Sequence, residues 1–409
     1  MAIEYRKLRS DDEYRAYARI AEYAFNGNAH SDEALARRES WYERDWLLAG
    51  FEGGEVVAGL AVVPFEMYVN GARIPLGGVA SVASLPERRR SGAVGGLLTH
   101  ALASMRDAGQ TLSALYTPHY SLYRRFGWEQ AGRMISYAFP PKPMRLRFPA
   151  PEGSYRRVGV DEWGALQTLH ARHWSGRNGA LVRPDRWWRT HILSSWRGEP
   201  NDAVIWSDVA GEARAYAVYR SSHQAVAGSP FGETTLRVHD WVALDAGGYA
   251  ALLSFLLTHD LAQRIVMLAS TDEPLAGAFV EPTHMSEPAG AWPGIMLRLV
   301  DVQRALEARP ALPQASGRGV TVALRDDKAP WNAGTWRIES SEGRISAERT
   351  AGAPQLEMDA CALASIYNGF TKPADAVRVG AVVARNDEAI GAAADIFAVA
   401  FAPYCPDDF

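Results

Sequence analysis

The N-terminal third of the chain alternates between strand-like and helix-like hydrophobic patterns. Alternating apolar and polar residues predict a strand over residues 3–8. Ser10 follows with Glu13 three positions later, which is a helix N-cap signal, and apolar residues then recur at helical spacing. Further along, Asn70-Gly71 between two apolar runs indicates a hairpin turn. This order of strands with two or three helices predicts a mixed α/β domain.

The most informative segment runs from Val82 to Leu98, where a strand-like run leads into a helix-like run through a basic turn. A helix N-terminus presents backbone N–H groups and the positive end of the helix dipole at one place. Gly92 lets a ligand approach the backbone, and Arg89 and Arg90 add charge and hydrogen-bond donors. The segment therefore predicts a site for a phosphate-rich ligand. Its Arg-x-x-Gly spacing differs from both P-loops and dinucleotide-binding turns.

This turn resembles the pyrophosphate turn of the GNAT N-acetyltransferases, which bind acetyl-CoA, although Val94 stands where that family usually has Gly or Ala. Residues 123–128 resemble the region after the family's fifth strand, where a tyrosine lies beside the CoA sulfur. The order and separation of both segments are most similar to the Eis-like (enhanced intracellular survival) branch. Residues 296–302 and the aromatic residue that closes an acidic tail extend this resemblance over the whole chain.

The resemblance implies an α/β (α+β) protein with two tandem GNAT-like domains and a sterol-carrier-protein-like C-terminal domain. We expect the acetyltransferase domain over 1–139, a second GNAT-like domain without a CoA turn over 144–300, and the sterol-carrier-like domain over 301–409. Prolines just after residue 139 indicate the first boundary, and the Pro- and Gly-rich stretch 309–319 indicates a loop. An unrelated α/β domain in the middle of the chain would show a similar pattern.

The resemblance also implies roles for individual residues. Tyr123 is expected to protonate the CoA thiolate, with Tyr116 and Tyr120 as nearby alternatives. The C-terminal carboxylate of Phe409 is expected to orient the acceptor amine or to relay its proton through water. The residues expected to bind acetyl-CoA are Val82, Ala83, Ser84, Arg89, Arg90, Ser91, Gly92, Ala93, Val94 and Ser121. Those expected to bind the acceptor are Phe25, Asp32, Trp41 and Asp408.

Composition narrows the classes of partner. The 409 residues carry a formal net charge of −4, which argues against nucleic acid as the main partner. Two cysteines cannot form a disulfide framework, and the ten histidines show no metal-ligand spacing, so no metal is expected. The sequence has no signal-peptide pattern and no apolar run of membrane-spanning length, so a cytoplasmic protein without membrane attachment is expected.

These observations predict an acetyl-CoA-dependent N-acetyltransferase that acts on a primary amine by direct attack in a ternary complex. An aminoglycoside, a polyamine or a lysine-like side chain would fit as acceptor. The alternative is a lipid- or small-molecule-binding protein that uses the sterol-carrier-like domain. The tryptophan-rich middle domain and the resemblance together predict a homo-oligomer, and the resemblance implies a hexamer.

Overall fold

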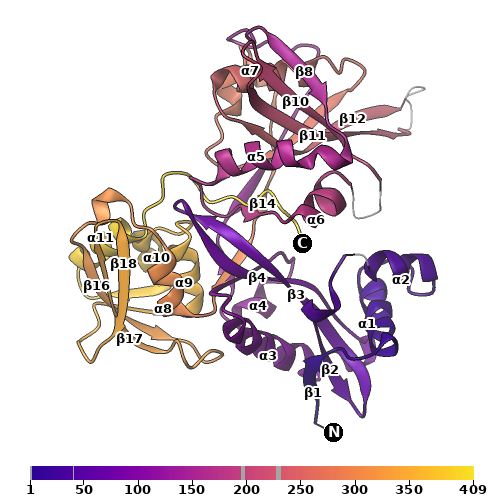
Figure 1. The fold of residues 1–409 in the computed structure, drawn as a ribbon. Coiled ribbons are helices and arrows are strands. Elements are labelled where there is room, and N and C mark those ends of the chain that lie inside the picture. Colours follow the sequence, from indigo (N-terminus) through magenta and orange to yellow (C-terminus); the bar gives the residue numbers. More distant parts are fainter. Residues whose placement is uncertain (1, 40, 195–198, 227–231) are drawn as a thin grey trace. The chain divides into compact units, whose positions relative to one another are not determined.

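The computed structural model describes residues 2–39, 41–194, 199–226 and 232–409, in two compact units that are each discontinuous in sequence (Figure 1). The first unit comprises Met1–Ala131, Ile295–Val399 and Asp407–Phe409. The second comprises Gly132–Gly294 and Ala400–Pro406. The last three residues of the chain therefore belong to the same unit as the N-terminal domain.

The N-terminal domain is built on a mixed sheet with the strand order β1-β2-β3-β4-β5-β15-β6. Only the β4–β5 pair runs parallel along this path. The strands are β1 (Glu4–Lys7), β2 (Leu47–Glu52), β3 (Glu55–Val69), β4 (Ala72–Ser84), β5 (Leu112–Leu115), β6 (Glu129–Gln130) and β15 (Met296–Leu299). The helices are α1 (Asp11–Ala24), α2 (Asp32–Glu39), α3 (Ala93–Asp107) and α4 (Tyr120–Arg124).

Local signals account for several of these elements. The Ser10 hydroxyl accepts the Glu13 N–H at 3.2 Å, so the predicted N-cap of α1 is confirmed. Asn70 and Gly71 have φ angles of 45° and 92°, as a type I′ hairpin turn requires. One face of α3 is buried against the sheet, and its core residues include Leu97, Leu98, Leu102 and Met105.

Two strands pair in a different sheet from the one that their place in the sequence suggests. The prolines after residue 139 predict that residues 137–139 end the first domain, but β7 (Arg133–Phe139) pairs with β13 in the second sheet. In its place, β15 lies between β5 and β6, with Met296 opposite Leu115. The hydrophobic pattern marks both segments as strands, but their partners are set by tertiary pairing, which the pattern does not encode.

The second unit contains a sheet with the order β14-β7-β13-β12-β11-β10-β8, in which β12 and β13 run parallel. The remaining strands of this sheet are β8 (Gly153–Arg157), β10 (Asp202–Asp208), β11 (Ala213–Gln224), β12 (Glu233–Ala243), β13 (Arg264–Ala269) and β14 (Ser286–Pro293). The short strand β9 (Leu181–Val182) is not part of this sheet. Its helices are α5 (Trp163–Trp174), α6 (Asp185–Trp187) and α7 (Ala246–Leu257). Apolar residues of this sheet and of α7 form its core.

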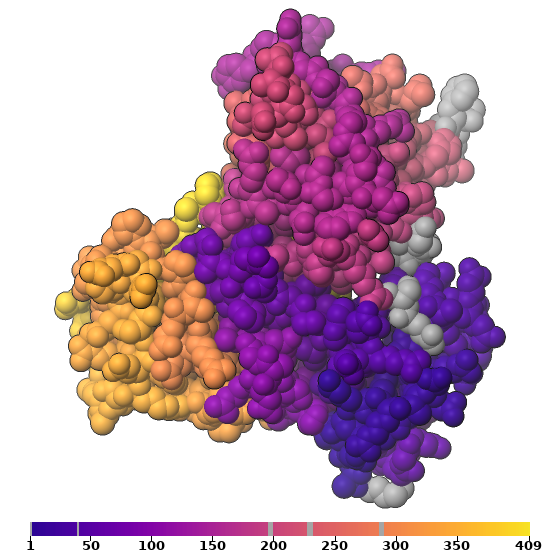
Figure 2. All heavy atoms as spheres, viewed as in Figure 1, coloured from indigo at the N-terminus to yellow at the C-terminus, as the bar shows by residue number. Residues whose placement is uncertain are grey.

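The third domain belongs to the first unit and has a sheet with the order β18-β17-β16-β19-β20. Its strands are β16 (Gly319–Arg325), β17 (Gly334–Ser341), β18 (Arg344–Arg349), β19 (Leu356–Asp359) and β20 (Val382–Ala384). Its helices are α8 (Val302–Ala308), α9 (Ala360–Tyr367), α10 (Pro373–Arg378) and α11 (Asp387–Ile396). Figure 2 shows its orange atoms directly against violet atoms of the N-terminal domain, and α9 contacts β15 and β6.

The loop expected over 309–319 begins with a buried anchor. Arg309 is fully buried and donates to the carbonyl oxygens of Tyr367, Ile396 and Ala398 at 2.9–3.0 Å. The backbone oxygens near the end of α11 are thereby satisfied by a distant side chain. Among the described residues, no helix is both long enough and apolar enough to cross a bilayer.

Candidate active site

The first feature of the site is the divergence of β4 and β5. Their parallel pairing ends at Gly78 opposite Ala114, whereas β4 continues to Ser84. Val82, Ala83 and Ser84 therefore lie beyond the last residue of β4 that pairs with β5. Backbone groups on a strand edge of this kind can pair with an extended ligand, as an added strand would.

A bulge in β4 lies within this diverging stretch. On β3, Gly59 pairs with Ala83 and Ala61 pairs with Ala80, so the pairing register shifts at Ser81. Ser81 has a φ of 55°, in the left-handed region that costs a residue with a side chain about 1–3 kcal/mol. The bulge rotates the following backbone, which includes the groups expected to contact the acetyl arm.

Side chains of α1 and α2 hold this bulge in place. The Tyr17 hydroxyl donates to the Ser81 carbonyl at 2.7 Å, and Arg38 Nη1 donates to Ser81 Oγ at 2.8 Å. Arg38 Nε in turn donates to Glu22 at 2.6 Å, and both of these side chains are nearly buried. No local pattern in the sequence predicts this group, because an ion pair between residues 16 positions apart has no characteristic spacing.

The turn before α3 directs backbone N–H groups toward solvent. Arg90 and Gly92 have positive φ angles of 65° and 90°, and a Cβ added at Gly92 would meet open space. The Ala93 N–H donates to Ser91 Oγ at 3.4 Å, and Gly96 makes the first intrahelical bond, to Gly92. The N–H groups of the first turn thus lie at the positive end of α3.

The arginines of this turn differ in their pairing. Arg88 forms an ion pair with Glu52 at 3.1 Å. Arg89 and Arg90 are exposed, and neither forms an ion pair with any residue that the structure describes. Two unpaired guanidinium groups beside a helix N-terminus fit the charge and geometry of a pyrophosphate.

Tyr123 lies on α4, 7% exposed, with its ring edge-to-face against Trp128 at a centroid distance of 6.3 Å. Burial raises the pKa of Tyr123 to about 12, so its hydroxyl keeps its proton throughout the neutral range. Ser121, one position into the same short helix, is exposed.

The chain terminus lies at the point where β4 and β5 separate. The Phe409 ring packs against Phe65 and Tyr116 at centroid distances of 5.4 and 5.7 Å. A Cβ added at Gly78 would come within 3.0 Å of the Phe409 ring. Asp408 beside it is exposed. The tail is thus anchored by its aromatic residue within the N-terminal domain.

The residues expected to bind the acceptor are brought together in part. The Arg38 guanidinium lies 5.7 Å from the Phe25 ring centroid and 5.8 Å from that of Trp41, so these two rings flank one cation. Asp32 is exposed in the first turn of α2, where a carboxylate stabilises the helix dipole. A structural role at the helix end is therefore sufficient to explain Asp32.

Comparison with known families follows the same domain order. Residues 4–131 and residues 179–299 each match an acetyltransferase (GNAT) domain, and residues 302–406 match a sterol carrier protein domain. The chain is also 25% identical to the N-acetyltransferase Eis of Mycobacterium tuberculosis, over 78% of this chain and 77% of that protein. The chain belongs to the Eis-like GNAT N-acetyltransferases.

Other proteins similar to this Eis-like enzyme align with it over most or all of both chains. Eis1 from Mycobacterium abscessus is 26% identical with a TM-score of 0.83, and both chains are fully covered. A GCN5-related N-acetyltransferase from Anabaena variabilis has a TM-score of 0.89 with full coverage of both chains at 22% identity, which shows a shared fold. A protein named as an uncharacterized N-acetyltransferase from Streptomyces coelicolor is 27% identical over 84% of each chain.

Proposed function

We propose that this Eis-like enzyme transfers the acetyl group of acetyl-CoA to a primary amine by direct attack, with both substrates bound together. One observation carries the proposal. A single domain combines diverging parallel strands, a left-handed turn before α3 and a buried tyrosine. Such a transfer needs three features: a strand edge that pairs with the extended arm of the cofactor, a site for its pyrophosphate, and a proton donor for the leaving sulfur.

On the cofactor side, bound acetyl-CoA supplies the thioester carbonyl that the amine attacks. The backbone of Val82 to Ser84 is proposed to pair with the acetyl-pantetheine arm, and an N–H group there to stabilise the developing oxyanion. Arg89, Arg90 and the backbone from Ser91 to Val94 are proposed to bind the pyrophosphate. Ser121 is proposed to contact the cofactor.

Tyr123 is proposed as the general acid. As the neutral amine nitrogen bonds to the acetyl carbon, the C–S bond breaks and the sulfur takes a proton from the Tyr123 hydroxyl. The acetylated nitrogen releases a proton to water, and water returns one to the Tyr123 oxygen. Because the pKa of Tyr123 is raised to about 12, the donor is fully protonated at neutral pH. A thiol has an ordinary pKa of about 8.5, so protonation of the leaving sulfur by this phenol is less favourable than by an exposed tyrosine and depends on close placement.

The C-terminal carboxylate and Asp408 are proposed to bind and orient a cationic amine. A terminal carboxyl with a pKa of about 3.5 is a poor direct base for an amine of pKa about 8, since the transfer is uphill by about 6 kcal/mol. Orientation, or relay of the proton through water, is the more economical role. The packing of the Phe409 ring against Phe65 and Tyr116 in the N-terminal domain supports this role.

Phe25 and Trp41 are proposed to form an aromatic wall for the acceptor, and Asp32, exposed in the first turn of α2, is proposed to attract a cationic acceptor. Negative charge at Asp32, at Asp408 and at the terminus favours cationic acceptors of the aminoglycoside, polyamine or lysine-like kind. The buried Glu22–Arg38 pair adds no net charge.

The second GNAT domain is proposed to have lost CoA binding. Asp245 caps α7 by accepting the Gly248 N–H at 2.8 Å, so a carboxylate stands at the helix N-terminus where a phosphate would bind. Beyond the end of the β12–β13 pairing at Val238 and Met267, the Trp241 indole donates to the Leu268 carbonyl at 2.9 Å. The Trp241 side chain thus bridges the two strands where they diverge, in the place where the arm of a cofactor would pair.

The test combines binding and turnover. Acetyl-CoA at about 100-fold excess over a micromolar dissociation constant should raise the melting temperature, since a ligand of the folded state adds about 2.7 kcal/mol at that excess. Free-thiol release over a panel of amines should then identify the acceptor class. Absence of any CoA-induced shift would contradict the proposal and favour ligand binding by the sterol-carrier-like domain.

The proposed assembly is a homo-oligomer, with a hexamer as the expected form. Light scattering at micromolar concentration measures this directly, and a monomer at that concentration would contradict it.

A further inference from the structure

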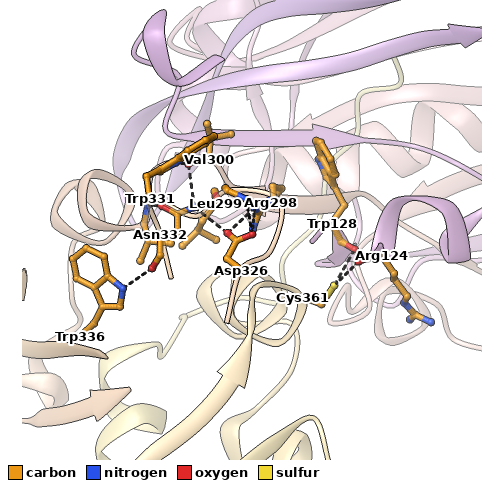
Figure 3. A network of polar contacts seen from close by, with 12 residues as sticks. Arg124, Trp128, Arg298, Leu299, Val300, Asp326, Trp331, Asn332, Trp336 and Cys361 are labelled. Atoms are coloured by element: carbon orange, nitrogen blue, oxygen red, sulfur yellow. Dashed lines mark hydrogen bonds and ion pairs between the residues drawn. The ribbon is translucent and has the colours of Figure 1, made fainter. Parts of the chain in front are cut away.

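The third domain contacts the N-terminal domain at the segment that carries Tyr123 (Figure 3). Residues 123–128, called here the tyrosine turn, run from the end of α4 to the start of β6. The Tyr123 carbonyl accepts the N–H groups of Phe126 and Trp128 at 2.9 and 3.3 Å. The Arg124 carbonyl accepts the N–H of Gly127 at 3.0 Å. The backbone of Tyr123 is thus fixed by the shape of this turn.

Cys361, in the first turn of α9, contacts both ends of the tyrosine turn. Its Sγ–H group lies 3.3 Å from the Arg124 carbonyl oxygen and 3.6 Å from that of Trp128, as Figure 3 shows. A sulfur donor at these distances makes weak hydrogen bonds to either acceptor. Burial raises the pKa of Cys361 to about 12, so the proton of this donor stays in place at neutral pH.

The middle of the turn lies against a buried arginine. Gly127 has a φ of 87°, and a Cβ added there would come within 2.7 Å of Arg298 Nη1 and 3.0 Å of the Ala360 Cβ. Arg298 is fully buried on β15, and its Nη2 donates to both carboxylate oxygens of Asp326, at 2.8 and 2.7 Å. The position of this guanidinium therefore limits where the turn can lie.

Asp326 is itself fixed by the third domain. Its carboxylate accepts the Ala329 N–H at 3.0 Å and the Asn332 side-chain amide at 3.1 Å. Asn332 also donates to the Val300 carbonyl and accepts the Val302 N–H, so it ties the end of β15 to the same loop. Trp331 donates to the Val300 carbonyl at 2.8 Å. These bonds form one continuous network, drawn in Figure 3.

We propose that Cys361 and the Arg298–Asp326 pair are positioning residues that hold the tyrosine turn and thereby place the Tyr123 hydroxyl. The inference rests on the proposed role of Tyr123 as the acid. A general acid must lie within hydrogen-bond reach of the atom it protonates, and small displacements of reacting groups reduce rates steeply. The third domain is then part of the catalytic apparatus through its packing, independently of the chain terminus.

The kinetic test compares Cys361→Ala with Cys361→Ser. Alanine removes the donor, whereas serine retains a hydroxyl donor of similar size. We expect kcat to fall about 3- to 10-fold in Cys361→Ala with little change in the KM for acetyl-CoA, and to recover in Cys361→Ser. In a Tyr123→Phe background, Cys361→Ala should cause no further loss, because residues that act through one hydroxyl are non-additive.

Hydrogen exchange tests the position of the turn without reference to catalysis. The amides of Phe126, Gly127 and Trp128 should exchange faster in Cys361→Ala than in Cys361→Ser. Ile338→Ala, which removes buried atoms from β17, is the control for general destabilisation of the third domain. It should lower the melting temperature and leave both kcat and these amides unchanged.

The outcomes are separable. Unchanged exchange in Cys361→Ala, equal losses of kcat with and without the Tyr123 hydroxyl, or an equal loss of kcat in Ile338→Ala would each overturn the inference. If exchange rises but Tyr123→Phe retains full kcat, Tyr123 is not the general acid. The inference that these residues position a catalytic hydroxyl is then overturned as well, although they still hold the turn.

Discussion

Tyr123 is buried beside Trp128, and this burial defines how the hydroxyl can act. Removal from water disfavours the phenolate, so the pKa of Tyr123 is raised to about 12 from an ordinary value of 10. The hydroxyl is then a donor over the whole working range of pH. A residue meant to act as a base would need the opposite shift.

Tyr123→Phe removes the hydroxyl and keeps the ring. We expect kcat to fall by about 10²-fold or more with little change in acetyl-CoA affinity. In the unmodified enzyme, kcat/KM should rise with pH as the acceptor amine loses its proton. It should show no fall near pH 10, where a tyrosine of ordinary pKa would ionise and the acid form would be lost. A fall of the profile near pH 10, or normal turnover of the variant, would reassign the role to Tyr116, Tyr120 or water.

Ser81 is the second residue whose conformation matters. Its left-handed backbone is a cost that the bonds from Tyr17 and Arg38 offset. Ser81→Ala loses the Arg38 bond and keeps the strain, whereas Ser81→Gly loses the bond but relieves the strain.

We therefore expect Ser81→Ala to be less stable than Ser81→Gly, by about 1 kcal/mol, which reverses the usual order of Ala and Gly in a strand. Thermal melting of the two variants measures the difference. Both should also lower kcat, since the bulge orients the backbone that follows. A more stable alanine variant would show that the bulge relaxes without cost.

At the scale of elements, the turn between β4 and α3 carries three consecutive arginines that differ in their contacts. Arg88 is paired with Glu52, whereas Arg89 and Arg90 project outward from the same short turn. This provides a matched set of substitutions within three consecutive residues.

The double variant Arg89→Ala/Arg90→Ala should weaken acetyl-CoA binding by about 10-fold or more, because charge-assisted bonds to phosphate are lost. The remaining affinity should depend less on salt, since fewer charges are screened. Arg88→Ala, the control, should change the dissociation constant much less. Calorimetric titration at two ionic strengths checks both effects, and equal losses in the control would place the pyrophosphate elsewhere.

At the scale of the whole molecule, the chain returns at its end to the domain where it began. Residues 400–406 pack in the second unit, where Tyr404 donates its N–H to the Asn178 carbonyl at 3.0 Å. Residues 407–409 belong to the first unit. The terminus is therefore held at two places along its last ten residues, which a frayed tail would not be.

A Gly-Ser extension after Phe409 should cut turnover strongly, because it replaces the terminal carboxylate with an amide and moves the charge. Deletion of Asp408 and Phe409 should do the same. Neither change touches the turn before α3, so the CoA-induced rise in melting temperature should persist. Turnover of a good amine substrate measures the effect, and Asp408→Asn serves as a variant that retains the terminal charge. Full activity of the extended protein would remove the carboxylate from the mechanism.

The sequence by itself determined the local elements and the family. Signals such as the Ser10 cap, the Asn70-Gly71 turn and the strand–turn–helix segment at Gly92 act over a few residues, so spacing along the chain is enough to identify them. The same holds for the segment around Tyr123. The domain ranges and the roles of the site residues stay predictions.

Only the tertiary structure decided which distant segments meet. It placed β15 in the first sheet and β7 in the second, paired Glu22 with Arg38 beneath Ser81, and set Cys361 against the tyrosine turn. Alternation marks a strand but does not name its neighbour, and a buried ion pair or a thiol contact has no characteristic spacing. These contacts form only when segments far apart in sequence bury a common core. Their contribution to stability therefore depends on the whole fold and cannot be assigned to a local stretch of sequence.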